Sequence, residues 1–397
     1  MSTIDRILEL EKYVIKWLHD PDSGLTESAD YSISSGLFSQ SDVDHAIRHF
    51  RRVISEGSFV KWYKDIIAQL DHPQTKPQDV LCLHAGNLPL VGLQDVLAVL
   101  ISGHDYYGKL SRKDPFIIES LLKYLVKSGI QNVKSWSSDL SDFYGINAQK
   151  WMFAGAEDSL PQLNSRLLSG GIITTESKNL IRTAHFSVAI VPECNETNVS
   201  ELVESMFRYQ GKGCRSVAVV FSDNRLVDCG HILESVAQDW FRSNGFSETG
   251  SSVADYRHAY NKAIGIPSLK VGNFVIQEGV VSIDHPEIIY WQCNKSVEEI
   301  VNGFGNGLQQ IYIASASASA SASASASASA SASASASASN SVISAEDQVD
   351  ALSGSVSESR LNLSKFADKI EFLRDAQQPA LDWKPDGVDV LKWLLTD

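Results

Sequence analysis

Hydrophobic positions recur at helical spacing through the first part of the chain. Apolar side chains three or four residues apart run through residues 4–18, 43–54 and 59–70, which predicts three amphipathic helices. From residue 79 the pattern changes to short apolar runs that are separated by longer segments of helical periodicity. The sequence therefore predicts a mostly helical first third, followed by strands and helices in alternation.

The alternating region has the pattern of buried strands joined by helices. Short apolar runs, each followed by glycine or polar residues, indicate strands at 79–84, 107–110, 151–154, 186–191 and 216–221. Helical periodicity lies between them, at 93–102, 115–128 and 199–209. Such alternation predicts an α/β fold with a doubly wound parallel sheet that continues into a second sheet. The strand at 79–84 runs into a polar turn, and open parallel sheets bind ligands at that end of a strand.

Composition agrees with a globular enzyme and disfavours several other classes. The 397 residues, 43% of them hydrophobic, leave room for two or three domains and a large core. The net charge of −14, without a stripe of Lys and Arg, argues against nucleic-acid binding. The first residues lack a signal-peptide pattern, and the most apolar stretch, 88–101, is too short to cross a bilayer. We expect a cytoplasmic protein without a membrane span.

Cysteine usage points to reduced thiols. The five cysteines are odd in number, widely spaced and without a Cys-x-x-Cys pair, so neither a disulfide framework nor a metal site is predicted. They are Cys82, Cys194, Cys214, Cys229 and Cys293. A cytoplasm would keep all of them reduced.

One of these cysteines has the setting of a nucleophile. The sequence Tyr-Gln-Gly-Lys-Gly-Cys-Arg-Ser, residues 209–216, places Cys214 after two glycines and just before an apolar strand. Glycines let the backbone turn tightly and leave one side of the sulfur open to a flat acyl group. Lys212 and Arg215 favour the reactive thiolate over the thiol. The alternative, a buried structural cysteine at a junction of loop and strand, stays open at this point.

Other segments, in a fixed order, carry a family resemblance. Cys-Leu-His-Ala-Gly-Asn-Leu-Pro-Leu occupies 82–90, and Gly-Lys-Leu-Ser-Arg-Lys-Asp occupies 108–114. His-Pro-Glu-Ile-Ile follows at 285–289, and Ala-Gln-Gln-Pro-Ala-Leu at 376–381. Together with the cysteine motif, they resemble the aldehyde dehydrogenase superfamily. More narrowly, they resemble its acyl-CoA reductase branch, the family of the fatty-acyl reductase of bacterial bioluminescence. The resemblance runs from about residue 80 onward.

The resemblance implies roles for the residues that match the family's motifs. Cys214 would be the nucleophile, and Asn87 would supply an oxyanion-hole amide. Lys109 and Ser111 would hold the cofactor ribose.

Two further cofactor contacts are implied with less complete motifs. Gly155, in a Gly-Ala pair where the superfamily has Gly-Ser, would face the cofactor diphosphate. Glu287 matches a glutamate that binds the nicotinamide ribose, although the usual Phe-Gly is missing after it.

The implied activity is reduction of an acyl-CoA, or of an acyl-protein thioester, to an aldehyde with NADH or NADPH. Superfamily members that oxidise aldehydes carry a glutamate that activates water; its place here, 34 residues before Cys214, is taken by Leu180 with Ile181 beside it. An acyl-enzyme should therefore survive for exchange with CoA. Glu176 is an outside candidate for a base, and His185 could tune the cysteine or simply pack at a strand start.

The domain organisation follows from the resemblance and from one unusual segment. Strict Ala-Ser alternation from residue 314 to 339 cannot bury a core, which indicates a flexible tether. We expect a helical N-terminus with a nicotinamide-cofactor domain at 1–178, a catalytic domain at 179–313, a linker at 314–345 and a C-terminal segment at 346–397 that completes the fold.

Two other functions remain open from the sequence. A cysteine acyltransferase or thioesterase would use the same acyl-enzyme without a redox step. A non-catalytic relative is also compatible with the Ala-Ser interruption. A homo-oligomer is a candidate assembly, although the β-hairpin that usually joins subunits is not evident before Asp79.

Overall fold

The structure is a computed structural model that describes residues 2–74, 76–246, 251–314, 366 and 369–396. The expected linker at 314–345 lies almost entirely outside the described residues. The chain forms two compact units. The first contains Met1–His185, Asn244–Phe246 and Gln378–Asp397, and the second contains Phe186–Ser243 and Ser247–Gln377.

The first unit opens with helices, as the hydrophobic pattern predicts. Ser2 caps the first of them through a reciprocal capping box with Asp5, which satisfies backbone N–H groups that the helix itself cannot pair. The bounds are α1 Thr3–His19, α2 Leu25–Ser34, α3 Gln40–Val53 and α4 Ser58–Ile67, with a short 3-10 turn η1 at Pro21–Ser23. Helix α2 was not predicted, because only three of its ten residues are buried and its apolar stripe is thin.

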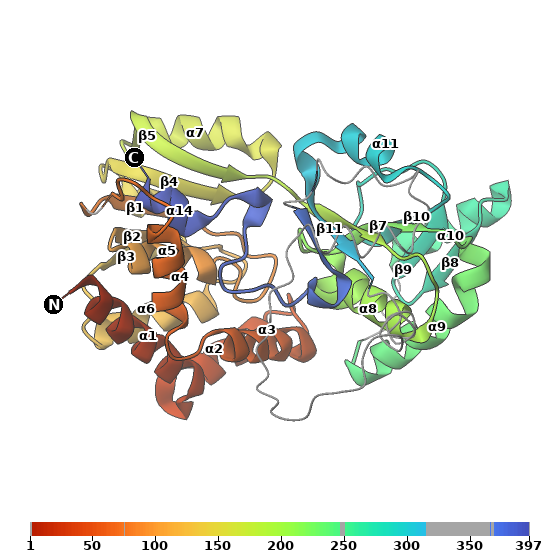
Figure 1. Cartoon of the computed structure of the whole chain (residues 1–397), viewed down its shortest axis with the longest axis horizontal. Helices are drawn as coiled ribbons and strands as arrows, with labels where there is room; N and C mark the ends of the chain where they lie inside the picture. Colours follow the sequence, from red (N-terminus) through yellow and green to blue (C-terminus); the bar gives the residue numbers. More distant parts are fainter. Residues whose placement is uncertain (1, 75, 247–250, 315–365, 367–368, 397) are drawn as a thin grey trace, which may run out of the picture. The chain divides into compact units, whose positions relative to one another are not determined.

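A parallel sheet follows in the order β3-β2-β1-β4-β5 (Figure 1). The strands are β1 Asp79–Leu83, β2 Asp105–Lys109, β3 Val133–Ser137, β4 Ala148–Ala154 and β5 Ile173–Arg182. Helices α5 Leu93–Ser102, α6 Phe116–Lys127 and α7 Leu160–Ser169 connect them, with 3-10 turns η2 Leu140–Phe143 and η3 Glu157–Ser159. The strand order reverses at β1, and ligands of open α/β sheets bind outside the strand ends at such a point.

Both faces of this sheet are covered. Val80 and Cys82 of β1 point into a core shared with α1 to α6, whereas Leu81 and Leu83 point into a second core with η2 and α7. This alternation follows from the two-residue period of a strand. Burial on both faces explains why the strand reads as a continuous apolar run instead of an alternating one.

The C-terminal part of the first unit packs against its helical layer. Helix α14 Val390–Leu395, preceded by the 3-10 turn η9 Pro385–Gly387, buries four of its six residues and packs against α5. Lys150, only 2% exposed, donates to the main-chain oxygens of Leu394 (2.8 Å) and Thr396 (2.6 Å). A cation at this place satisfies carbonyls that the end of the helix leaves unpaired.

The second unit is built on a seven-stranded sheet in the order β12-β11-β6-β7-β10-β9-β8, parallel except for the β8–β9 pair. Its strands are β6 Phe186–Ile190, β7 Val217–Ser222, β8 Ser268–Val271, β9 Phe274–Glu278, β10 Ile288–Cys293, β11 Leu308–Ile313 and β12 Ile370–Phe372. Its helices are α8 Glu196–Phe207, α9 Leu226–Ser243, α10 Ser252–Ile264 and α11 Val297–Val301, with 3-10 turns η4 Arg208–Gly211, η5 Asn302–Gly307 and η8 Leu373–Asp375. The predicted continuation into a second sheet is confirmed.

The structure corrects one expectation about the cysteines. Cys194, which precedes α8, and Cys229, in the first turns of α9, form a disulfide across 35 residues of sequence. The prediction of five reduced thiols is therefore wrong for these two. The physical reason is tertiary: the crossover from β6 through α8 and β7 brings the start of α9 beside the loop that follows β6, and α8 packs against α9.

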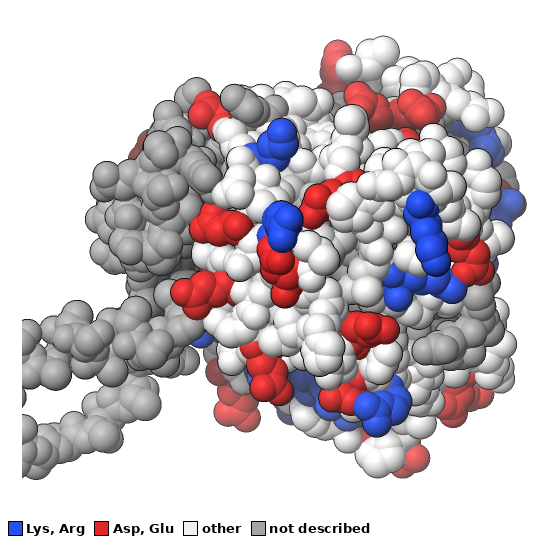
Figure 2. Space-filling model, turned by 90° about the vertical axis from the view of Figure 1, so that its right-hand side faces the viewer, with Lys and Arg blue, Asp and Glu red and all other residues white. Residues whose placement is uncertain are grey.

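The described surface is mixed in charge. Figure 2 shows the side of the second unit that carries α10; there, Lys and Arg lie among Asp and Glu, and no continuous basic stripe forms among the described residues. No described helix combines the length and the apolar character that a bilayer crossing requires. No cluster of His, Cys, Asp and Glu among the described residues could hold a metal ion.

Candidate functional site

In the first unit, polar groups gather where parallel strands end. The His84 main-chain N–H, just after β1, donates to the carbonyl of Lys109 at the end of β2 (2.9 Å). The Gly155 N–H, just after β4, donates to the carbonyl of Arg182 at the end of β5 (3.1 Å). The segments predicted to hold a cofactor thus lie along one edge of this sheet.

The Gly-Asn turn and the residues after β2 pack closely together. A Cβ atom added at Gly86 would lie 2.2 Å from Ser111 Oγ and 2.4 Å from its Cβ, so only glycine fits at this position. Ser111 and the turn residues Ala85 and Leu88 line one small cavity of about 10 Å³. Asn87 itself is exposed at the tip of the turn.

Lys109 and Gly155 both lie in crowded surroundings. Lys109 is half-buried, and burial, assisted by Arg112, lowers the pKa of its ammonium group. Gly155 is also tightly packed, because an added Cβ would lie 2.6 Å from the Phe153 ring. The segment after Gly155 begins as a 3-10 turn, and α7 starts only at Leu160. Glu157 and Asp158 are exposed in that turn.

A buried ion pair fixes the end of β5 beside this edge. Arg182 donates to both carboxylate oxygens of Asp95 on α5 (3.0 and 2.6 Å), and neither side chain is more than 9% exposed. The attraction of Asp95 raises the pKa of Arg182 against the opposing effect of burial. Just beyond, Asp386 accepts hydrogen bonds from the Thr183 and Ala184 main-chain N–H groups (2.9 and 3.1 Å).

The residues considered as bases lie on or beside β5. Leu180 is buried and Ile181 is partly exposed, and neither can take a proton. Glu176 is exposed and precedes Arg182 by six residues, which places it about 20 Å from this strand end at the usual rise per residue. His185 lies beyond the strand, exposed, with Nδ1 3.3 Å from the Thr183 carbonyl. A carboxylate base at the strand end is therefore not available from β5.

In the second unit, Cys214 follows an unusual turn. Tyr209, Gln210 and Gly211 have φ angles of 57°, 57° and 68°, three successive residues in the left-handed region. For Tyr and Gln this conformation is strained, and such strain concentrates at functional sites. The turn ends α8 and leads through Gly213 to Cys214, which is partly exposed and lies three residues before β7.

The loop that carries Cys214 is attached to the neighbouring strand. Ser187 Oγ on β6 donates to the Cys214 carbonyl (2.9 Å). The hydroxyl of Tyr312 on β11 lies 3.5 Å from the Ala376 carbonyl oxygen, to which it donates. Tyr312 is fully buried, and burial raises the pKa of its phenol. The Ser187 side chain therefore holds the main chain at Cys214.

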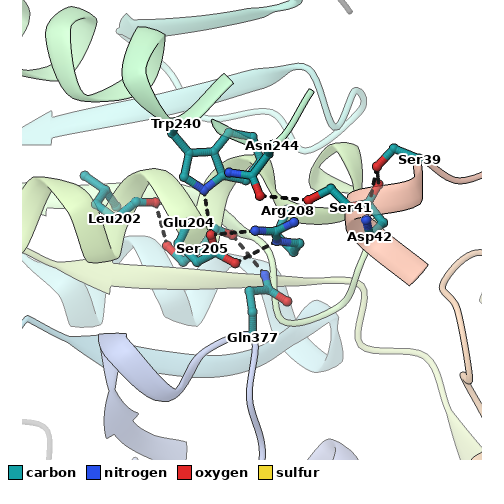
Figure 3. A network of polar contacts seen from close by, with 10 residues as sticks. All are labelled: Ser39, Ser41, Asp42, Leu202, Glu204, Ser205, Arg208, Trp240, Asn244 and Gln377. Atoms are coloured by element: carbon teal, nitrogen blue, oxygen red, sulfur yellow. Dashed lines mark hydrogen bonds and ion pairs between the residues drawn. The ribbon is translucent and has the colours of Figure 1, made fainter. Parts of the chain in front are cut away.

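A second group of side chains braces the turn on its α8 side (Figure 3). Arg208, 4% exposed, donates from Nε and Nη2 to the two carboxylate oxygens of Glu204 (2.7 and 3.0 Å). The Trp240 indole N–H donates to the same carboxylate, and the Arg208 guanidinium lies 4.9 Å from the centre of the indole ring. Arg208, which immediately precedes the strained turn, is thus held by its ion pair with Glu204 and by the Trp240 ring.

Glu287 approaches the same turn from another strand. It is half-buried and directly precedes β10, which pairs in parallel with β7. An added Cβ at Gly211 would lie 2.8 Å from the carbonyl oxygen of Pro286, so this segment packs against the turn. The cysteine motif and the Glu287 segment therefore meet at the amino edge of the second sheet.

The other cysteines are placed differently from Cys214. Cys82 is buried in β1, and burial raises the pKa of its thiol well above the ordinary range. Cys293 is partly exposed, but it ends β10 and so lies at the opposite edge of the second sheet.

Comparison with solved structures identifies the architecture. An indole-3-acetaldehyde dehydrogenase (AldA) of P. syringae, crystallised with NAD⁺ and IAA, matches with a TM-score of 0.54 and 12% identity over 79% of this chain and 72% of that one. The aldehyde dehydrogenase KauB of Pseudomonas aeruginosa gives 0.54 and 13%, over 82% and 74%. The chain has the aldehyde dehydrogenase fold. Aldehyde dehydrogenase C (AldC) of Pseudomonas syringae, crystallised with NAD⁺ and octanal, gives 0.54 and 12%, over 81% and 74%. No protein-family model and no curated protein sequence matches the chain.

Sequence reasoning singled out the candidate segments but missed the residues that hold them. Within the first unit the structure brings Asn87, Ser111, Lys109 and Gly155 to one sheet edge, and within the second it brings the Cys214 turn and the Glu287 segment together. The supporting residues Ser187, Glu204, Arg208 and Trp240 were not predicted. Only the four-residue spacing of Glu204 and Arg208 at the end of a predicted helix could have indicated one of these contacts.

Proposed function

We propose that this protein reduces an acyl-CoA, or an acyl-protein thioester, to an aldehyde with NAD(P)H through an acyl-enzyme on Cys214. The observation that carries the proposal is the setting of this thiol: Cys214 follows a strained turn that Arg208 precedes, and Ser187 holds its carbonyl. The aldehyde dehydrogenase fold supports cysteine chemistry coupled to a nicotinamide cofactor, and two of the solved structures were crystallised with NAD⁺.

The residues along the edge of the first sheet fit such a cofactor. Gly86 and Gly155 have no side chain between the backbone and its neighbours, and a Cβ atom would collide with Ser111 at Gly86 and with Phe153 at Gly155. The strand order reverses at β1, which is the usual position of a dinucleotide crevice. Lys109 and Ser111 would hold the adenosine ribose, the N–H groups after Gly155 would face the diphosphate, and Glu287 would contact the nicotinamide ribose. When bound, the nicotinamide supplies a hydride to the acyl carbon.

The protein's own part in the chemistry centres on one sulfur atom. The Cys214 thiolate attacks the thioester carbonyl, the bond from carbon to the CoA sulfur breaks, and CoA leaves as a thiolate that takes up a proton. The Cys214 main-chain N–H and the Asn87 side-chain amide would donate to the oxyanion. After hydride addition, the bond from carbon to Cys214 sulfur breaks, which releases the aldehyde and restores the thiolate.

The residues of β5 favour reduction over oxidation of an aldehyde. Oxidation needs water to hydrolyse the acyl-enzyme, and a base must activate that water. Leu180 and Ile181 stand where such a base would be expected, and Glu176 lies toward the other end of the strand. An acyl group on Cys214 would therefore persist until a hydride or CoA removes it.

Intact-mass spectrometry after mixing with an acyl-CoA tests the first half of the reaction. We expect one acyl adduct in the wild type and in Cys293→Ala, and none in Cys214→Ala. Cys293 is the matched control because it is also a partly exposed free thiol. Consumption of NADH or NADPH with aldehyde formation tests the second half. An adduct that survives Cys214→Ala would overturn the assignment of the nucleophile.

The same measurements separate the competing functions. An adduct on Cys214 in a protein that neither binds nor consumes a nicotinamide would establish an acyltransferase or thioesterase instead. Absence of any adduct across a panel of acyl-CoA chain lengths would establish a non-catalytic relative.

A further inference from the structure

Helix α10 of the second unit borders an open groove that none of the assigned roles uses. Its volume of about 470 Å³ is within the range of small-molecule sites. We call it the α10 groove, and it is lined by Ser252, Val253, Tyr256, Arg257, Tyr260 and His285.

Two aromatic rings in the α10 groove are exposed to solvent. Tyr256 and Tyr260 are 71% and 48% exposed, far more than most tyrosines, which bury much of their ring. Their rings are stacked, with centroids 6.3 Å apart and planes inclined by 18°. Exposed rings of this kind offer faces on which a flat base can stack.

The same groove carries a positive charge that no described carboxylate pairs. Arg257 is half-buried and makes no ion pair or hydrogen bond with any residue that the structure describes. Asp255, one position earlier, is instead paired with Lys270. His285 is exposed on the other side, and the hydroxyl of Ser252 adds a donor. Guanidinium and hydroxyl groups beside aromatic rings suit a ligand with a base and phosphates.

The α10 groove is linked by a short path to the reactive thiol. His285 is followed by Pro286, whose carbonyl oxygen packs against Gly211 in the turn before Cys214. The same segment leads into β10, which pairs with β7, the strand that follows Cys214. The groove and the thiol therefore share the amino edge of the second sheet.

We propose that the α10 groove binds the phosphorylated adenosine end of coenzyme A, with its thioester directed to Cys214. The inference rests on the proposed function, because that function supplies a CoA thioester as substrate. Stacking on Tyr256 or Tyr260 holds the adenine, and Arg257 with His285 holds the phosphates.

Binding of adenosine 3′,5′-bisphosphate, which is the nucleotide end of CoA without its thioester arm, tests the groove directly. We expect calorimetry to detect binding to the wild type and about tenfold weaker binding to Tyr256→Ala and to Arg257→Gln. Tyr144→Ala is the matched control, because Tyr144 is 59% exposed on the first unit. Both tyrosines are largely exposed, so their removal leaves the fold intact, which circular dichroism verifies.

Kinetics with two substrates separate the groove from the chemistry. For an acyl-CoA, the groove variants should raise KM about tenfold and leave kcat unchanged. For the matching acyl-pantetheine, which lacks the nucleotide, the variants should behave like the wild type. If acyl-pantetheine acylates Cys214 but the variants bind the bisphosphate normally, the groove proposal is overturned and the proposed function stands.

Three other outcomes also have a fixed meaning. Failure of both substrates to acylate Cys214 rejects the proposed function, while specific bisphosphate binding in the groove would still support a CoA site. Stronger binding of adenosine 2′,5′-bisphosphate, the fragment that represents NADPH, overturns the assignment to CoA. Loss of a dimer in Tyr256→Ala, with bisphosphate binding unchanged, would assign the groove to a second copy of the chain instead.

Discussion

His84, at the end of β1 and next to the Gly-Asn turn, should make the first unit sensitive to mild acid. Its ring is buried, and Nε2 lies 2.7 Å from the Tyr106 hydroxyl. An added Cβ at Gly92 would lie 2.1 Å from Nδ1, so only glycine at position 92 leaves room for the imidazole ring. Burial lowers the pKa of His84 from its ordinary value of 6.5 to about 4.

The sign and size of the effect follow from this pKa. Between pH 6.5 and pH 4 the unfolded chain binds a proton at His84 that the folded chain does not, so the free energy of unfolding falls as the pH falls. The difference between the two pKa values corresponds to about 3 kcal/mol, at roughly 1.4 kcal/mol per pH unit. This contribution is fully present above pH 6.5 and lost once the pH is below about 4.

A neutral replacement isolates the contribution of this one ring. In His84→Gln the free energy of unfolding, measured by urea titration at several pH values, should depend on pH less steeply than in the wild type, by up to about 3 kcal/mol. The comparison is needed because burial also lowers the pKa of His104 and adds a pH dependence of the same sign. His72→Gln, at an exposed position, is the control and should match the wild type. An NMR titration of His84 with a midpoint near 6.5 would refute the reasoning.

Three further changes give measurable outcomes. Ser187→Ala removes the hydrogen bond to the Cys214 carbonyl. It should slow acylation about fivefold in quenched-flow mass spectrometry and lower the free energy of unfolding by only about 1 kcal/mol in denaturant titration. Equal acylation rates in the variant and the wild type would contradict a positioning role for Ser187. Cys229→Ser breaks the disulfide and should lower that free energy by about 2–4 kcal/mol, an effect that reductant should reproduce in the wild type and not in the variant. Asp95→Asn leaves the buried Arg182 without its counter-charge and should cost about 3–5 kcal/mol, whereas a loss below 1 kcal/mol in calorimetry would show that the pair contributes little.

Local pattern was enough to predict the fold class. The strands of the first sheet are buried on both faces and therefore read as plain apolar runs, as Val80 to Leu83 show. The turn before Cys214 was recognisable because its glycines mark a tight bend. The extension of left-handed geometry to Tyr209 and Gln210 was not, because side chains of this size rarely adopt it and only the surrounding contacts impose it.

What the sequence could not supply are contacts between distant segments. Cys194 and Cys229 pair only because α8 and α9 pack together, and nothing in their spacing indicates this. Likewise, Lys150 has the sequence context of a surface residue, yet it is buried beneath the end of α14. The α10 groove depends on His285 meeting a helix that lies more than twenty residues earlier in the chain.

The attachment of α14 to the first unit has a consequence for synthesis on the ribosome. The β-strands of that unit are complete by Arg182, but the part of the apolar surface of α5 that α14 covers stays exposed until Leu395 has emerged, 210 residues after His185. At the usual 5–20 residues per second this is a wait of roughly 10 to 40 seconds. During this interval the nascent chain contains an incompletely folded domain with exposed apolar surface that can aggregate. We therefore expect its yield in cells to depend on chaperones that bind exposed apolar segments.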